Sequence, residues 1–290
     1  MAESTPYQVV VTGSDGQLGK ELARIAGNHP KFQFTFLTRL EFPLEETLST
    51  QAWLSQHPVD FFINCAAYTA VDKAESEKEI AFRINATAPG DLAYQLAKKK
   101  ATLIHISTDY VFDGTSALPL KEDAPTNPVN IYGASKLKGE QLVMQNNPES
   151  LIIRTSWLFS EYGNNFLRTM IRLMTERESV RVVMDQEGSP TYAADLAKAI
   201  LQILESKTII PGIYHYSNEG KTSWFEFAEE IKRLTGSNCT VIPIPSAGFP
   251  TPAKRPAYSL LDKSKIKKDY GLQIPHWKTS LALCVGLIRQ

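Results

Sequence analysis

The sequence predicts an α/β fold, in which helices cover both faces of a doubly wound parallel sheet, together with a smaller α/β lobe. Two observations carry this prediction. Short apolar runs alternate with stretches of helical spacing through the first half of the chain, which is the pattern of βαβ units. The apolar runs are also continuous, as expected of strands that are buried on both faces.

The predicted elements follow one another in chain order. The first strand, 8–12, is a β-branched run that meets a glycine-rich turn, and Leu18, Leu22 and Ile25 then recur at helical spacing over 17–26. Further strands are expected at 32–37, 61–66, 102–107 and 151–155, and further helices at 47–56, 78–99 and 134–145. Glycine and prolines interrupt any period over 113–128, where we expect irregular chain.

The alternation loosens after Trp157, which favours a second, smaller lobe. Helices are expected at 165–176 and 193–205, separated by a turn at Gly188, and prolines punctuate the segment 243–256. We therefore expect a dinucleotide-binding domain at 1–156 and mainly a substrate-binding lobe at 157–290, with chain crossings back to the first domain.

Composition excludes several classes of protein. The 290 residues are 43% hydrophobic and 21% charged, which is ordinary for a globular chain. Lys plus Arg and Asp plus Glu balance at 31 each, so no net field favours nucleic acid or an anionic membrane surface. Three widely spaced cysteines suit a reducing compartment, and no targeting segment or membrane-length apolar run is evident. We expect a cytoplasmic protein.

The glycine-rich turn predicts a site for a dinucleotide. Glycines recur every third residue in 13–19, directly after the first strand and at the start of a helix. Such a turn allows backbone to approach a pyrophosphate, and the helix start presents free amides to it, as in Rossmann folds. The residues expected there are Gly13, Asp15, Gly16, Gln17, Leu18 and Gly19. A purely structural turn is the alternative.

The end of the second strand bears on which nicotinamide cofactor binds. Arg39 follows this strand and suits a 2′-phosphate, whereas Glu41 stands two residues later and is expected to point away. This favours NADPH, with NADH as an alternative. An exposed surface arginine is the other interpretation of Arg39.

A phenol and an ammonium form the candidate catalytic pair. Tyr132 and Lys136 are four residues apart, so they share one face of the helix that starts there. A nearby cation favours the phenolate and brings a tyrosine into the range of acid–base catalysis. Thr108 closes the strand 102–107 at the ligand-binding edge of the sheet and suits a developing alkoxide. The Tyr-x-x-x-Lys spacing alone also occurs by chance.

Together these motifs resemble the extended short-chain dehydrogenases/reductases. The segment from Asn64 to Tyr68 and Asn85 in the following helix complete the resemblance along the first half of the chain. It implies a catalytic set of Thr108, Tyr132 and Lys136, with a supporting role for Asn85. It also implies that the cofactor contacts Ala66, Ala67, Tyr68, Tyr132 and Lys136.

Six blocks extend the resemblance over nearly the whole chain, to the dTDP-4-dehydrorhamnose reductases within that family. The blocks are 69–75, 107–112, 154–157, 163–166, 185–191 and 251–256. The resemblance implies reduction of the C4 ketone of a dTDP-linked 6-deoxy-4-keto sugar. It places the substrate against Thr69, Val71, Asp109, Trp157, Asn165, Gln186, Thr191 and Arg255. Trp157 in the core and Asn165 as a helix cap are the structural alternatives.

Two positions, Tyr110 and Pro43, distinguish this chain from related proteins, and His105 needs a separate interpretation. Related 4,6-dehydratases carry an Asp-Glu pair after the threonine, and here Tyr110 replaces the glutamate, so elimination lacks its base. Pro43 stands where the family often has an acidic residue on the adenine side of the cofactor, and Leu44 keeps the apolar contact there. His105 is expected to be a core histidine.

Further alternatives remain at this stage. No His or Cys cluster indicates a metal site in the sequence, although some of these reductases carry Mg²⁺ at a subunit contact, and a homodimer is compatible with the chain. A non-catalytic regulatory subunit, like that of methionine adenosyltransferase, and a reductase of another nucleotide 4-keto-6-deoxy sugar are the competing functions.

Overall fold

The computed structural model describes residues 5–288. At its centre, a sheet of six parallel strands has the order β10-β5-β4-β3-β1-β2. The strands are β1 (Tyr7–Thr12), β2 (Phe32–Leu37), β3 (Phe61–Asn64), β4 (Thr102–Thr108), β5 (Leu151–Thr155) and β10 (Gly212–Tyr216). The predicted α/β class with a parallel sheet is confirmed.

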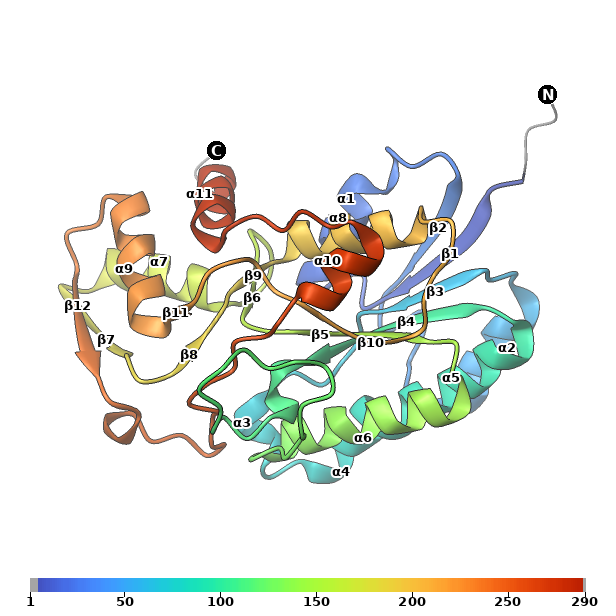
Figure 1. Cartoon of the computed structure of the whole chain (residues 1–290), viewed down its shortest axis with the longest axis horizontal. Coiled ribbons are helices and arrows are strands. Elements are labelled where there is room, and N and C mark those ends of the chain that lie inside the picture. The colour runs from blue at the N-terminus through green and yellow to red at the C-terminus, as the bar shows by residue number, and fades with distance from the viewer. Residues whose placement is uncertain (1–4, 289–290) are drawn as a thin grey trace.

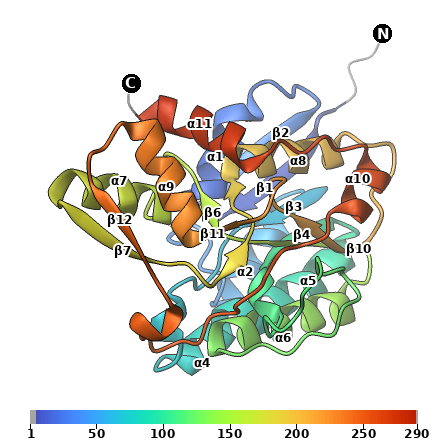
Figure 2. The same cartoon turned by 60° about the vertical axis from the view of Figure 1, so that its left-hand side comes forward.

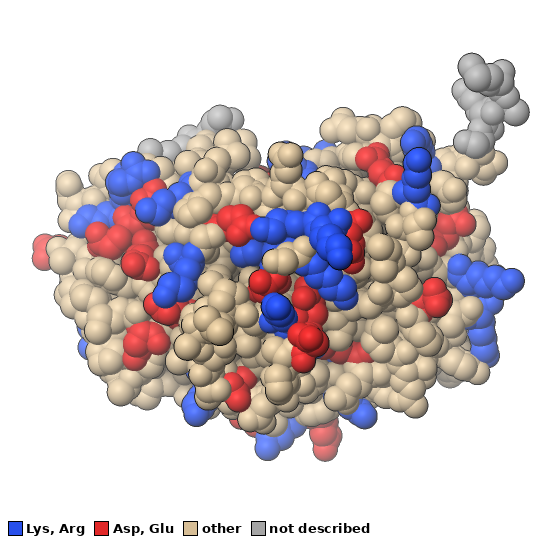
Figure 3. Space-filling view, viewed as in Figure 1, with Lys and Arg blue, Asp and Glu red and all other residues tan. Residues whose placement is uncertain are grey.

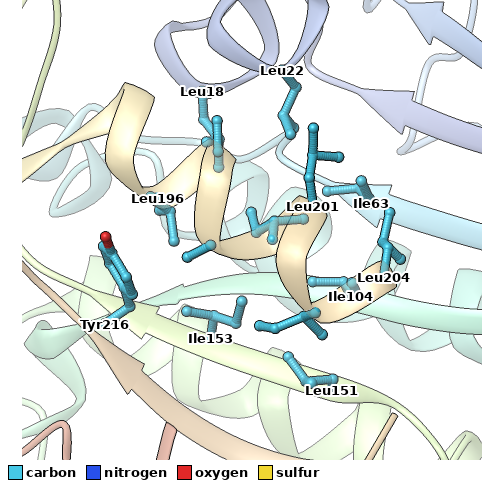
Figure 4. Close-up of a cluster of buried hydrophobic side chains, with 14 of the residues drawn as sticks. Leu18, Leu22, Ile63, Ile104, Leu151, Ile153, Leu196, Leu201, Leu204 and Tyr216 are labelled. Carbon is cyan, nitrogen blue, oxygen red and sulfur yellow. The ribbon is translucent and has the colours of Figure 1, made fainter. Parts of the chain in front are cut away.

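Helices cover both faces of this sheet (Figure 1). Those on one face are α1 (Gln17–Ala26) and α8 (Ala193–Leu204), and those on the other are α2 (Thr47–Gln56), α5 (Ala88–Lys99) and α6 (Ile131–Asn146). Because side chains alternate along a strand, Val9 and Val11 join the core under α1 and α8, whereas Val10 joins the opposite core. Figure 4 shows leucines of α1 and α8 directed at isoleucines of β3, β4 and β5.

The order in which successive strands are added to the sheet reverses between β1 and β3. Strand β1 has β2 on one side and β3 on the other, and the chain then continues outward through β4 and β5. A crevice opens at the carboxyl ends of the strands where the order reverses, and ligands of α/β sheets bind there. The glycine turn after β1 and the segment after β3 both lie at this point.

Three predicted boundaries are corrected. The strand expected at 61–66 ends at Asn64, so Cys65 and Ala66 already belong to the segment that faces the crevice. The helix expected at 78–99 is α4 (Lys78–Phe82), a π-helical turn (Arg83–Thr87) and α5 in succession. The helix expected at 134–145 begins at Ile131, because Asn130 Oδ1 accepts the Gly133 N–H at 2.8 Å and caps it.

The second lobe packs three helices around a small parallel sheet (Figure 2). The helices are α7 (Phe166–Glu176), α9 (Trp224–Thr235) and α11 (Trp277–Ile288), and the strands are β7 (Ser179–Val183) and β12 (Thr240–Ile244). Its core is separate from those of the central sheet. The predicted helix 165–176 is α7, with Asn165 as its N-cap.

The later half of the chain returns to the central sheet. Strand β10, which the sequence analysis did not predict, pairs with β5, and α10 (Ser264–Tyr270) packs beside it. Short elements complete the fold. They are the pairs β6 (Leu158–Phe159) with β9 (Thr191–Tyr192) and β8 (Glu187–Gly188) with β11 (Thr222–Ser223), the helix α3 (Val71–Ala74), and 3₁₀ turns at Asp109–Val111 and Ser246–Gly248. Irregular chain over 113–128 is confirmed apart from an isolated bridge at Leu120.

Acidic and basic side chains lie beside one another on the face of the molecule shown in Figure 3. None of the helices in the described part of the chain combines the length and the apolar character needed to cross a bilayer.

Candidate active site

A cavity of about 820 Å³ opens at the carboxyl edge of the sheet. Its walls come from both halves of the chain. They comprise the glycine turn, the chain after β2 and β3, the end of β4, the start of α6, residues 155–158, residues 163–164 and the first residue of α9. Such a cavity at a switch point is the expected ligand site of this fold.

Close backbone contacts explain the glycine spacing of the turn. A Cβ on Gly13, whose φ is +68°, would lie 2.8 Å from Ala66 N, and one on Gly19 would lie 2.3 Å from Gly13 O. Gly16 precedes α1 without a side-chain cap, so the free N–H groups of the first turn face the cavity. This cradle fits a diphosphate.

Every residue expected at the cofactor lines this cavity: Gly13, Asp15, Gly16, Gln17, Leu18, Gly19, Arg39, Ala66, Ala67, Tyr68, Tyr132 and Lys136. Phe42 and Leu44 add a buried apolar wall after β2, where the sequence analysis expected Leu44 to replace a family contact. The lining residues thus suit a dinucleotide along its length.

Arg39 stands at the rim with its side chain exposed and paired to Glu45. Glu41 points back instead, since it accepts the N–H and the hydroxyl of Thr38, both at 2.8 Å. The Arg39 guanidinium helps hold the pKa of Glu45 below its usual range against the opposing effect of burial. A 2′-phosphate at Arg39 would therefore compete with Glu45.

Thr108, at the end of β4, is buried at the floor of the cavity. Its Oγ1 accepts the Tyr110 N–H at 3.2 Å and lies 3.1 Å from Asp109 Oδ1. Burial raises the pKa of Asp109 to about 6, although hydrogen bonds from Ser259 and Thr108 oppose that change. These contacts fix the Thr108 hydroxyl at the floor of the cavity.

Tyr132 lies on the first turn of α6 beside Thr108. Burial raises the pKa of its phenol to about 12, and the neighbouring Thr108 hydroxyl partly offsets that effect. The ring of Tyr110 meets it edge to face, with centroids 5.6 Å apart. The expected shift toward the phenolate by a nearby cation is therefore not found. The phenol is protonated at neutral pH, which is the form that a proton donor needs.

Lys136 lies one turn after Tyr132 and is 1% exposed. Its Nζ donates to Ile106 O at 2.7 Å and lies 3.4 Å from His105 Nε2. Burial lowers the pKa of this amine to about 8. The helical spacing has brought phenol and amine to one wall of the cavity, as expected.

Asn85 connects this wall to the chain after β3. Its Nδ2 donates to Ser135 Oγ and to Tyr68 O, both at 3.0 Å, and its Oδ1 accepts the Tyr68 N–H at 2.8 Å. The side chain lies in the π-helical turn before α5 and is fully buried. It positions the chain around Tyr68 against α6, in keeping with a supporting role.

Four of the residues expected at the substrate line the cavity: Thr69, Val71, Asp109 and Trp157. Trp157 has a left-handed φ of +48° and stacks on Trp224, with ring centroids 3.7 Å apart and planes 11° apart. Trp224 also lines the cavity. The sequence analysis missed Trp224, although the capping box of Ser223 and Glu226 marks the start of a helix there.

The other four expected substrate residues lie outside the cavity lining. Asn165 caps α7, and its Nδ2 donates to Gln17 Oε1 at 2.9 Å. Gln186 donates to Ser246 Oγ at 3.0 Å, and Thr191 is fully buried against Thr155. The structure therefore gives these three side chains contacts within the protein.

Arg255, the fourth, is paired with Asp72 of α3. Its Nη2 lies 2.8 Å from Asp72 Oδ2 and its Nη1 lies 3.1 Å from Oδ1. The Ala253 N–H donates to the same carboxylate at 3.1 Å. The segment 251–256 of the second lobe is thereby fastened across α3 beside the cavity; we call this segment the strap.

Residues 5–288 contain no group of three or more His, Cys, Asp or Glu side chains arranged to hold a metal ion. Cys65, Cys239 and Cys284 are free thiols.

Comparison with known proteins agrees with this geometry. The family model described as RmlD substrate binding domain matches residues 7–289. A dTDP-4-dehydrorhamnose reductase of Burkholderia thailandensis is 39% identical over 96% of this chain and 98% of its own. A dTDP-4-keto-6-deoxy-D-glucose reductase of Streptomyces niveus is 36% identical over 96% of both chains.

Among solved structures, a dTDP-4-dehydrorhamnose reductase of Bacillus anthracis in complex with NADP superimposes with a TM-score of 0.94. It is 38% identical, and the match covers 99% of this chain and all of that one. The fold, the cavity and the family model spanning nearly all described residues agree, and the chain belongs to the RmlD family of dTDP-4-dehydrorhamnose reductases.

Proposed function

We propose that this protein uses NADPH to reduce the C4 ketone of dTDP-4-dehydro-L-rhamnose to dTDP-L-rhamnose. The observation that carries the proposal is a single cavity that is lined both by the glycine turn and by Thr108, Tyr132 and Lys136. The 39% identity to a reductase of that name over nearly the whole chain supports the substrate.

In this proposal, side chains and backbone amides of the protein bind the cofactor, orient the substrate and protonate the ketone oxygen. The amides at the start of α1 would hold the cofactor diphosphate, and Phe42 and Leu44 would cover its adenine side. The bound nicotinamide supplies the hydride. The protonated phenol of Tyr132 gives its proton to the ketone oxygen as charge develops there, while the hydroxyl of Thr108 stabilises that oxygen.

The residue after Asp109 argues against elimination of water by the same site. Tyr110 stands in the cavity wall, and burial raises its pKa above that of an ordinary phenol. Such a group stays protonated and cannot act as the base that a dehydratase requires at this position.

The substrate is assigned to the lobe formed mainly by 157–290 and the cofactor to 1–156. Trp157, stacked on Trp224, offers an apolar surface for the sugar. The diphosphate is assigned to Asn165 and Arg255 and the thymine to Gln186 and Thr191. These assignments require Arg255 to leave Asp72, Gln186 to leave Ser246 and the fully buried Thr191 to become accessible when substrate binds. A cytoplasmic location agrees with the free thiols, and the homodimer rests on the family resemblance.

A panel of dTDP-, UDP- and GDP-linked 4-keto-6-deoxy sugars tests the function. Purified protein should oxidise NADPH, measured as the loss of absorbance at 340 nm, with the highest kcat/KM for dTDP-4-dehydro-L-rhamnose. Proton NMR of the product should show the rhamno configuration at C4. A clear preference for dTDP-4-keto-6-deoxy-D-glucose would favour the activity named for the Streptomyces niveus relative. Tight NADPH binding without turnover on any sugar would favour the regulatory alternative.

A further inference from the structure

Trp157 has a backbone conformation that large side chains rarely adopt. Its φ is +48°, and among residues 5–288 the only other non-glycine residue with a positive φ is Lys100, at the C-cap of α5. Bulky residues avoid this region because the Cβ approaches the backbone. Such strain persists only where the surrounding structure imposes it. The contacts of Trp157 therefore show what holds it.

The backbone on both sides of Trp157 is bonded to the segment 189–191. Trp157 O accepts the Thr191 N–H at 3.2 Å, and Leu158 of β6 pairs with Thr191 of β9. The Ser156 hydroxyl donates to Ser189 O at 2.6 Å. The chain at Trp157 thus cannot relax to an ordinary φ without breaking these bonds.

The indole ring of Trp157 is stacked on Trp224, with centroids 3.7 Å apart. Trp224 is itself held in place, because it is the first residue of the capped helix α9. Ser223 Oγ accepts the Glu226 N–H at 3.1 Å, and Glu226 Oε2 accepts the Ser223 N–H at 2.8 Å. The ring of Phe166 packs on Trp224 with centroids 4.6 Å apart. Trp224 is therefore a rigid support for one face of Trp157.

Gly188 of β8 abuts the same indole ring. A Cβ on Gly188 would lie 3.0 Å from both Cε2 and Cζ2 of Trp157 and 2.9 Å from Ser259 Oγ. The φ of Gly188 is not in the left-handed region, so space, and not backbone conformation, requires glycine here. The Ser259 hydroxyl can turn aside by a change of rotamer, whereas the indole has to move as a whole.

The pair of short strands β8 and β11 connects the two supports. Gly188 pairs with Thr222, two residues before Trp224. Both tryptophans line the cavity, but Gly188 does not. An effect of Gly188 on a bound ligand therefore has to pass through a neighbour such as Trp157.

We propose that Trp224 and Gly188 are positioning residues that hold the Trp157 ring where the sugar of the substrate binds. The identity of this sugar rests on the proposed function, whereas the fixed position of the ring does not. Because Trp224 covers one face of Trp157, the sugar contacts the edges of the stacked pair and not that face. The wall is present before the substrate arrives, so Trp157 loses no rotamer freedom on binding.

The rigidity of Trp157 can be measured in ¹⁵N-tryptophan-labelled protein without cofactor or sugar. The four tryptophans give four indole N–H signals, and the one missing from Trp157→Phe identifies the residue. We expect its ¹H–¹⁵N NOE to equal that of the rigid backbone, to fall in Trp224→Leu and to be retained in Trp224→Phe, which keeps an aromatic face. A mobile indole in the unsubstituted protein would overturn the proposal.

Gly188→Ala tests the second support. The new Cβ should displace the ring, so we expect the Trp157 indole signal to move. Gly286→Ala is the matched control, because Gly286 lies on α11 of the same lobe and no heavy atom is within 4 Å of a Cβ built there. An identical Trp157 signal in both variants would show that Gly188 does not position the ring.

Binding of the sugar is isolated by comparing dTDP-L-rhamnose with dTDP, which lacks it, by calorimetry in the presence of NADP⁺. Trp224→Leu and Gly188→Ala should each raise the Kd for dTDP-L-rhamnose about two- to tenfold, as expected for an aromatic contact, and leave that for dTDP unchanged. Trp224→Phe should recover most of the loss. If Trp224 only stabilises the lobe, Trp224→Leu lowers Tm without changing either Kd, which refutes the positioning role.

A double variant shows whether Trp224 acts through Trp157. In the Trp157→Ala background, Trp224→Leu should add nothing to the Kd for dTDP-L-rhamnose. Additive effects would mean that Trp224 binds the sugar independently and would overturn its role as a positioning residue.

Failure of the proposed function would be recognised separately. In that case the unsubstituted protein binds dTDP-L-rhamnose no more tightly than dTDP. The NMR measurements use no sugar, so they still decide whether Trp224 and Gly188 fix the Trp157 ring.

Discussion

Burial keeps the phenol of Tyr132 protonated at neutral pH. Burial raises its pKa to about 12, and the Thr108 hydroxyl only partly opposes that effect. In the direction of ketone reduction this is an advantage, because the acid form is the reactive one. The same environment would make the reverse oxidation depend on higher pH.

Tyr132→Phe removes the proton donor and leaves the apolar ring. Because general acid catalysis contributes about 10²- to 10⁴-fold, we expect kcat to fall within that range. The Kd for NADPH, measured by fluorescence quenching, should stay within about twofold, since the lost hydroxyl is worth little in binding a cofactor held along the whole cavity. A variant that keeps more than a tenth of the rate would exclude Tyr132 as the donor.

Substitutions of Arg39 and Glu45 should change the KM for NADPH in opposite directions. Arg39→Ala should raise the KM for NADPH about tenfold and leave that for NADH unchanged, as expected for the loss of a charge-assisted bond to the 2′-phosphate. Glu45→Gln removes the competing carboxylate of the rim pair and should lower the KM for NADPH by at most about fivefold. Equal effects of Arg39→Ala on both cofactors would place the phosphate elsewhere.

At the scale of elements, the start of α1 depends on backbone contact more than on side chains. Gly19 sits on the first turn, where its Cα approaches the carbonyl of Gly13, whereas Gly27 at the far end of the helix has no heavy atom within 4 Å of a Cβ built on it. A side chain is thus excluded at Gly19 on the first turn of α1 and accommodated at Gly27, the C-cap of the same helix.

Gly19→Ala should displace the turn, because its Cβ would lie 2.3 Å from Gly13 O. With about 1–3 kcal/mol of overpacking, we expect the Kd for NADPH to rise about tenfold or more and Tm to fall. Gly27→Ala is the matched control and should leave Kd unchanged and the free energy of unfolding equal or up to about 1 kcal/mol higher. Similar Kd values for the two variants would contradict a phosphate cradle here.

The strap lies beside the cavity and is attached to α3 through Asp72. Asp72→Asn weakens its attachment to α3, since the Arg255 hydrogen bond is the main cause of the lowered pKa of Asp72. We expect the KM for the sugar to rise about two- to fivefold, as for a partly exposed pair, with the KM for NADPH unchanged.

Arg255→Lys distinguishes the two roles of the arginine. If it only holds the strap, its effect on the KM for the sugar matches that of Asp72→Asn, and the double variant is no worse than either. If it also binds the substrate diphosphate, its effect is larger and adds to that of Asp72→Asn.

At the scale of the molecule, buried polar side chains link strand β5 to helix α6, to the edge strand β10 and to the chain at Leu120. The Arg154–Glu140 pair is at most 3% exposed, and Arg154 Nη1 lies 3.5 Å from His215 Nε2 on β10. His215 Nδ1 donates to Leu120 O at 3.0 Å. Burial and the Arg154 charge lower the pKa of His215 to about 3, so the histidine is neutral in the folded protein.

His215 should therefore make the fold sensitive to acid. Its folded-state pKa lies below the unfolded value of about 6.5, so the unfolded state binds the extra proton and stability is lost as pH falls from 6.5 toward 3. The slope from one such group is about 1.4 kcal/mol per pH unit. In urea titrations across this range, His215→Gln should lose stability less steeply than the unsubstituted protein. Parallel pH curves would show that His215 is not titrating.

The order of strands and helices in the first half could be predicted from the sequence, because each element buries a local apolar pattern of its own period. The same holds for the glycine turn and for the Tyr132–Lys136 pair, whose geometry follows from a single helix turn. These features need no information from distant parts of the chain.

The tertiary structure alone decided the contacts between distant segments. Strand β10 joins the sheet beside β5, Trp224 stacks on Trp157, Arg255 faces Asp72, and His105 is oriented by Asn64. No local period marks such partners, because they meet only when separate elements pack and bury polar groups that must then find one another. The catalytic pair is thus determined locally, and the surroundings that set its protonation are determined by the fold.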